Sequence, residues 1–210
     1  MKYSFRHSMK WSIFISAVTF VLAAVFSVSS TIILEGVAWG MGMLIVLGLV
    51  MIGIVFDMMG LASAAANETP FHAMASEKVK GAKQAIGIVR NADRFSNFCN
   101  DVVGDVSGII SGAASAMVVL KLLTSLNAEQ SALYTTVSVV FSALVSALTV
   151  GGKALGKSLA IRNATQIVLI IGKFFYFLEH RFGIRIFNTV KKKSNNGKRG
   201  NKRARANQPT

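Results

Sequence analysis

Three long stretches with almost no charge constrain the fold of this chain more than any other feature of its sequence. Residues 11–67, 95–120 and 122–152 contain no basic residue. Five acids interrupt them: Glu35, Asp57, Asp101, Asp105 and Glu129. About 20 apolar helical residues suffice to cross a hydrocarbon core about 30 Å thick. The stretches therefore exclude an ordinary soluble domain and predict an all-α integral membrane protein.

Four transmembrane helices fit these stretches. We expect them at residues 11–34, from residue 37 to about 63, from 95 to about 123, and from 131 to about 150. Lys2, Arg6 and Lys10 precede the first span, as in a signal peptide, but this apolar run is about twice as long as the usual 7 to 15 residues. We therefore interpret residues 1–36 as an additional, retained transmembrane helix, with a cleaved signal as the alternative.

The distribution of basic residues predicts the orientation. The chain holds 23 Lys and Arg against 9 Asp and Glu, and eight of the basic residues lie in the last 20 positions. Because basic loops stay in the cytoplasm, both termini and the loop at 68–94 are predicted to be cytoplasmic, and the turns at Glu35 and near Asn127 external. The expected location is the plasma (inner) membrane. A glycosylation motif at Asn67 is discounted because it lies on the cytoplasmic side.

Residues 186–210 are predicted to form a disordered, basic, cytoplasmic tail. The last 20 residues contain no acid. Beside a membrane, such a tail most often reflects cytoplasmic retention, and anionic lipid is its expected partner. Tethering of nucleic acid is a weaker alternative.

Two further helices are expected on the cytoplasmic side. One is amphipathic, lies against the membrane, and begins with Thr69 as N-cap and Pro70 at the first helical position. Its apolar residues recur at roughly helical spacing: Phe71, Met74, Val79, Ala82, Ile86 and Val89. The other is the run 167–178, which is too short to cross and contains Lys173, so we expect an interfacial or re-entrant juxtamembrane helix.

The sequence shows no set of catalytic residues. His7, His72 and His180 are scattered through segments that flank the spans, and Cys99 is the single cysteine. No phosphate-binding loop is present. We therefore expect no enzymatic activity.

The third span carries a regular pattern of polar and small residues. Asn97, Asp101 and Asp105 are spaced four apart, which places their oxygens on one face of an α-helix. A ridge of mostly small residues runs beside them: Asn100, Gly104, Gly108, Gly112 and Ala116. Serines flank the ridge at positions 107, 111 and 115. The ridge predicts a seam of helix packing.

The acids of this span have two interpretations. A carboxylate that faces lipid costs about 2.5 to 3.5 kcal/mol, so Asp101 and Asp105 are expected to face protein or water. Their oxygens are hard ligands of the kind that Mg²⁺ prefers. The alternative is that both acids lie in the inner leaflet and are hydrated or paired with Lys153.

Three segments follow one another in a familiar order: FDMMGLASAAANETP, ending at Pro70; MASEKVKGAKQAIGIVRNADRFSNF, ending at Phe98; and GGKALGKSLAIRNATQI, starting at Gly151. Over residues 37–185 the chain resembles the transmembrane domain of the CNNM and CorB/CorC family of magnesium and cobalt transporters. The matching positions are Glu68, Thr69, Asn91, Arg94, Phe95, Gly152, Leu155, Lys157, Ser158, Leu159, Ala160, Arg162 and Asn163.

The resemblance implies a homodimer and a Mg²⁺ site within the spans. Its implied ligands in this chain are Ser63, Asn100, Asp101 and Asp105. Three positions depart from the family: Lys153 replaces the glutamate that binds Mg²⁺, Gly156 replaces a proline, and Ala65 replaces a serine, with Ser63 nearby. No counterpart of the family's cytosolic CBS pair is present. We expect transport or sensing of a divalent cation, with a membrane scaffold that does not transport as the alternative.

Overall fold

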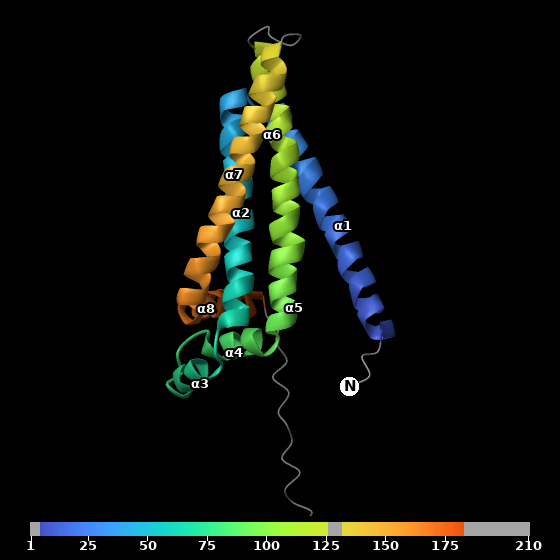
Figure 1. Ribbon diagram of the computed structural model, residues 1–210. Coiled ribbons are helices and arrows are strands. Elements are labelled where there is room, and N and C mark those ends of the chain that lie inside the picture. Colours follow the sequence, from blue (N-terminus) through green and yellow to red (C-terminus); the bar gives the residue numbers. More distant parts are fainter. Residues whose placement is uncertain (1–4, 126–131, 183–210) are drawn as a thin grey trace, which may run out of the picture.

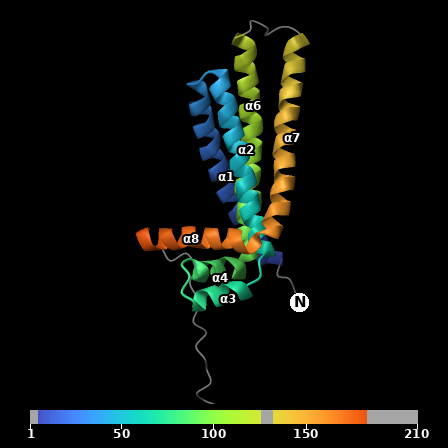
Figure 2. The same cartoon turned by 90° about the vertical axis from the view of Figure 1, so that its left-hand side faces the viewer.

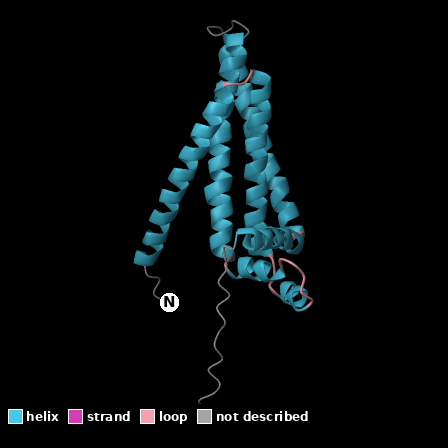
Figure 3. Cartoon of the chain, turned by 180° about the vertical axis from the view of Figure 1, so that it is seen from behind, coloured by secondary structure: helices cyan, strands magenta, loops and turns pink. Residues whose placement is uncertain are grey.

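A computed structural model describes residues 5–125 and 132–182, and these ranges contain helices and loops without a strand (Figure 3). The predicted tail at 186–210 and the turn near Asn127 lie outside the described residues. The helices are α1 (Phe5–Glu35), α2 (Trp39–Ala65), α3 (Thr69–Ser76), α4 (Ala82–Arg90), α5 (Ala92–Asn97), the π-helix η1 (Phe98–Gly104), α6 (Asp105–Ser125), α7 (Ala132–Arg162) and α8 (Ala164–Phe182).

Four helical segments of the described chain are long and apolar enough to cross a membrane. They are Ser12–Glu35, Trp39–Ala65, Ala92–Ser125 and Thr135–Arg162. This result confirms the prediction of a multi-pass, all-helical membrane protein. The third segment is continuous because α5, η1 and α6 follow one another without a break.

The long helices form a bundle around α2, which packs against α6, η1 and α7. The helix α1 contacts α6 and diverges from the bundle toward its own N-terminus (Figure 1). Its C-terminal end is held by Lys121 of α6. The Lys121 ammonium donates hydrogen bonds to the carbonyl oxygens of Leu34, Glu35 (3.0 Å) and Val37 (3.0 Å). The lysine thus bonds carbonyl oxygens at the end of α1 and in the turn before α2, where the regular i to i+4 pairing has ended.

Three short helices lie across one end of the bundle, and we call α3, α4 and α8 the basal layer. The helix α8 runs nearly at right angles to the spans, and α4 lies beneath it (Figure 2). Within the described residues, α8 is not among the segments long and apolar enough to cross a membrane, which agrees with the prediction for residues 167–178. One hydrophobic cluster joins this layer to the ends of α2 and α7, and includes Ala62, Phe71, Ile88, Ala160 and Val168.

The prediction of a single amphipathic helix after Thr69 is wrong, because two helices joined by a sharp loop occupy this region. Lys78 has φ 59° and Gly81 has φ 85°, which is the left-handed conformation that ends α3 and starts α4. Thr69 is the first residue of α3 rather than its cap, and Glu68 occupies the capping position. Pro70 lies in the first turn as predicted.

The fourth span was predicted to end near Val150, but α7 continues to Arg162. Gly152 and Gly156 both lie within α7. Each of them lets α7 approach α2 closely. A Cβ atom on Gly152 would overlap the side chain of Ile54, and one on Gly156 would lie 2.9 Å from Cγ of Met58.

The ridge of the third span packs within the chain only at Asn100 and Gly104, which contact α2, and not at Gly108 and Gly112. A Cβ atom on Gly108 or Gly112 would meet nothing within 4 Å, whereas the serines at 107, 111 and 115 are buried. Ser111 and Ser115 donate their hydroxyl protons to the carbonyl oxygens of Gly108 and Gly112. Because these hydroxyls are satisfied within their own helix, the serine face can pack closely against its neighbours.

Candidate functional site

The predicted stripe of acids lies on the outer surface of the third span. Asn97, Asp101 and Asp105 are all exposed in the chain. The Asp105 carboxylate accepts a hydrogen bond from the Lys153 ammonium over 3.2 Å, and its side chain remains 66% exposed. The stripe therefore forms no internal cation site within one chain. The predicted pairing with Lys153 exists at Asp105.

The π-helix η1 separates the two halves of this span. Its i to i+5 hydrogen bonds widen the helix by about one residue per turn, and the stripe continues across it because four residues still make close to one full turn. Cys99, Val102, Val103 and Gly104 of η1 are buried. Asn100 is half-buried and faces α2, whereas its neighbour Asp101 faces outward.

Asp57 is the buried acid of the bundle. It is the only charged residue of α2 and is 5% exposed. Within the described residues its Oδ2 atom has no hydrogen-bond partner, and the nearest cation, the Lys157 ammonium, lies 4.0 Å away. A buried carboxylate with so loose a partner is costly to maintain.

Two more polar atoms without partners lie along the same helix contact. They are Oδ1 of Asn100 and Oγ of Ser107, again considering only the described residues. Three glycines allow the two helices to approach closely here. A Cβ atom on Gly53 would lie 3.3 Å from Ser107 Cβ and from the Gly104 carbonyl oxygen, and one on Gly60 would overlap Asn100 Oδ1.

Along α2, Asp57 lies between the close contacts at Gly53 and at Gly60. A Cβ atom on Gly104 would lie 3.8 Å from Asp57 Oδ1. Gly53, Asp57 and Gly60 follow one another along one face of α2, opposite Ser107, Gly104 and Asn100. We call Asp57, Asn100, Gly104 and Ser107 the polar seam.

Two lysines of α7 border the polar seam. Lys153 donates to Asp105 and also reaches the Gly104 carbonyl oxygen at 3.5 Å, and its side chain is 20% exposed. Lys157 approaches Asp57, and its side chain is 57% exposed. The carboxylates of Asp57 and Asp105 are thus balanced by two ammonium groups. Lys153 is bound closely, and Lys157 only loosely.

The remaining predicted residues do not join the polar seam. Ser63 is fully buried, and its hydroxyl donates to the carbonyl oxygen of Gly60 at 2.6 Å. Glu68 lies between α2 and α3 and binds Nε2 of His72 at 2.7 Å and Nη2 of Arg90 at 2.6 Å. The hydrogen bond from His72 and the nearby Arg90 guanidinium lower the pKa of the Glu68 carboxyl. Glu68 therefore links α3 to α4 in the basal layer.

The chemistry of the polar seam is that of hard oxygen atoms. In the described ranges, no group of three or more His, Cys, Asp and Glu residues is placed to hold a metal ion. The seam instead offers one carboxylate together with amide, hydroxyl and carbonyl oxygens. Mg²⁺ keeps several of its waters and binds through only one or two carboxylates, so this composition is compatible with it.

Sequence reasoning did not single out Asp57. Asp57 stood out only as a rare charge, whereas attention went to the regular spacing of Asn97, Asp101 and Asp105 and to the ligands that the family resemblance implies. The signal available was that Asp57 is the single charge in a 27-residue apolar helix.

Comparison with protein-family models, with curated proteins and with solved structures finds no match to this chain.

Proposed function

We propose that this protein transports or senses a divalent cation such as Mg²⁺ or Co²⁺ through the polar seam. The observation that carries the proposal is the buried Asp57 carboxylate, whose Oδ2 atom has no hydrogen-bond partner within the described residues. An ionisable residue inside a membrane span is functional by default, because an idle one costs about 2.5 to 3.5 kcal/mol. The resemblance to the CNNM and CorB/CorC family supports the same function.

The two lysines would take the place of a cation when none is bound. Lys157 lies 4.0 Å from Asp57, beyond hydrogen-bonding distance, so a divalent ion can displace it at little cost. Lys153 is held by Asp105 and by the Gly104 carbonyl, which leaves Asp57 as the carboxylate free to bind the ion. In this proposal Asn100 and Ser107 supply neutral oxygens.

The proposal includes an orientation and an assembly. The basal layer and both termini would be cytoplasmic in the plasma (inner) membrane, as the basic residues predict. The open face at Gly108 and Gly112 would supply a seam for a homodimer, since small residues let helices approach closely in lipid. The basic tail would bind anionic lipid rather than nucleic acid.

Ion flux through reconstituted vesicles tests the proposal. The native protein should carry Mg²⁺ or Co²⁺ down a gradient, and Asp57→Asn should abolish the flux, because an amide cannot balance the charge of the ion. Asp101→Asn is the matched control, since it makes the same chemical change on the exposed face of the same bundle and should leave flux nearly unchanged.

Two results would contradict the proposal. Absence of native flux, together with absence of a rise in unfolding temperature on addition of either ion, would favour the scaffold that does not transport. A loss of flux in Asp101→Asn with normal flux in Asp57→Asn would place the cation site on the exposed stripe of acids instead of the polar seam.

A further inference from the structure

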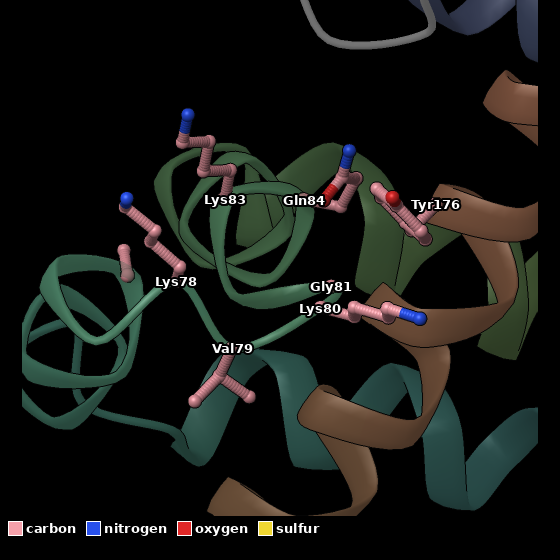
Figure 4. A pocket seen from close by; sticks show the side chains of 8 residues that line it. Lys78, Val79, Lys80, Gly81, Lys83, Gln84 and Tyr176 are labelled. Carbon is pink, nitrogen blue, oxygen red and sulfur yellow. The ribbon is translucent and has the colours of Figure 1, made fainter.

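A basic cavity lies in the basal layer, away from the polar seam. Its volume is about 180 Å³, and it opens beside the loop between α3 and α4. Lys78, Lys80 and Lys83 line it together with Gln84 of α4 and Tyr176 of α8 (Figure 4). No acidic side chain is among the residues that line it.

The three lysines are free to bind an anion. All three are exposed, and within the described ranges no ion pair engages them. Figure 4 shows the side chains of Lys78 and Lys83 extending to the same side of the loop, while Lys80 runs toward α8. The adjacent acid on α8, Glu179, accepts a hydrogen bond from Nε2 of Gln84 at 2.8 Å.

The backbone of the loop adds to the positive potential. The first turn of α4 contributes Lys83 and Gln84 to the cavity, and the N-terminal end of a helix carries a partial positive charge. The left-handed residues Lys78 and Gly81 turn the chain so that the lysines and the start of α4 line the same cavity. The site therefore combines side-chain charge with a helix terminus.

The apolar face of α8 turns away from this cavity, so the cavity would lie on the headgroup side of the helix. Ile170, Phe174 and Phe177 are 59 to 65% exposed and share one face of α8. The opposite face, at Gly172, packs on Gly81 and Ala85. Because α4 lies beneath α8, the exposed apolar face of α8 points to the side on which the spans lie (Figure 2). Such a helix lies in the boundary between acyl chains and headgroups.

We propose that this cavity binds the phosphate of an anionic phospholipid headgroup. Lys78, Lys80 and Lys83 would bind the phosphate oxygens, and Tyr176 would lie at the level of the headgroups, where its ring and hydroxyl meet apolar and polar surroundings. A cavity of this size holds a headgroup or an inorganic phosphate, which share the same chemistry. The membrane-facing surface of α8 favours the lipid as the source.

Native mass spectrometry of the full-length protein in detergent tests the site. Phosphatidylglycerol should be retained more strongly than phosphatidylcholine. Replacing Lys78, Lys80 and Lys83 together by Gln should weaken that retention by at least about tenfold, given about 1 kcal/mol per basic residue near anionic lipid. The matched control replaces Lys191, Lys192 and Lys193 by Gln, which removes the same charge from the tail. Replacement of the three loop lysines by Arg should restore retention.

Three outcomes would overturn the proposal. They are equal loss of lipid in the loop and tail variants, equal retention of the two lipids by the native protein, and saturation of the cavity by inorganic phosphate without retention of phosphatidylglycerol. An unchanged unfolding temperature in the loop variant would show that lost binding does not reflect lost folding. The proposal is independent of cation flux, because none of these lysines contributes to the polar seam.

Discussion

Gly81 and Gly172 meet backbone to backbone where α4 crosses beneath α8. A Cβ atom on Gly81 would lie 2.7 Å from the carbonyl carbon of Gly172, and one on Gly172 would overlap the carbonyl oxygen of Gly81. Backbone atoms leave no room to adjust, unlike the end of a flexible side chain. The attachment of α8 to the rest of the basal layer therefore requires glycine at both positions.

We predict that Gly172→Ala lowers the free energy of unfolding by about 1 to 3 kcal/mol, because the added methyl group forces α4 away from α8. The measurement is thermal or denaturant unfolding in detergent. Gly48→Ala is the control: a Cβ atom there meets nothing within 4 Å, so it should be neutral or slightly stabilising. Equal destabilisation of the two variants would refute the close contact.

Lys121 should stabilise the contact between α1 and α6. Lys121→Met removes the hydrogen bonds to the carbonyls of Leu34, Glu35 and Val37 and should cost about 1 to 3 kcal/mol. Glu35→Gln should cost little, because the lysine contacts the backbone oxygen of Glu35 rather than its carboxylate. If Glu35→Gln destabilised the protein as much as Lys121→Met, a side-chain ion pair would explain the effect instead.

Lys153→Glu should strengthen the binding of divalent cations. The variant places a second carboxylate beside Asp105 and removes the ammonium that balances Asp105 in the native protein. Two neighbouring carboxylates repel each other, so a divalent cation should bind between them. The unfolding temperature of the variant should rise with added Mg²⁺ by more than that of the native protein. Lys153→Ala should show a smaller increase, and an equal response of all three proteins would contradict the prediction.

The ion pairs of Glu68 predict a dependence on pH. Because His72 and Arg90 lower its pKa below the usual 4.5, the carboxylate stabilises the fold above pH 4.5 and loses this contribution as the pH falls through the lowered value. The protection of the α3 amides, measured as the exchange rate relative to the intrinsic rate at each pH, should therefore fall below pH 4.5. Glu68→Gln should show rapid exchange in α3 already at neutral pH, with a weaker dependence on pH in this range.

The spans could be predicted from the sequence because hydrophobic length alone determines them. The run without basic residues from 11 to 67 covers α1 from Trp11 onward and all of α2, and Glu35 with Gly36 marks the turn between them. The end of α7 was missed because Gly151 and Gly152 weaken a helix on average, whereas contact of Gly152 with Ile54 favours glycine here.

The site was harder to predict, since it depends on which helix faces which. The spacing of Asn97, Asp101 and Asp105 does place them together, but it could not show that this face of the span points outward. The partners of Asp57 come from a segment more than 40 residues later in the chain, so no local pattern connects them. A single acid in a long apolar helix was the available signal for the buried Asp57 carboxylate.

The π-helix also determines how this chain would tolerate changes in length. A π-helix accommodates about one extra residue per turn, so removing one residue between Phe98 and Gly104 would let α5 and α6 join as a regular α-helix with little change in their relative orientation. The flanking helices would keep their packing, and the change would fall on the residues of η1 itself, which include Asn100 and Gly104 of the polar seam. In related chains, therefore, a one-residue gap at this point would mark a change in the polar seam within an otherwise unchanged bundle.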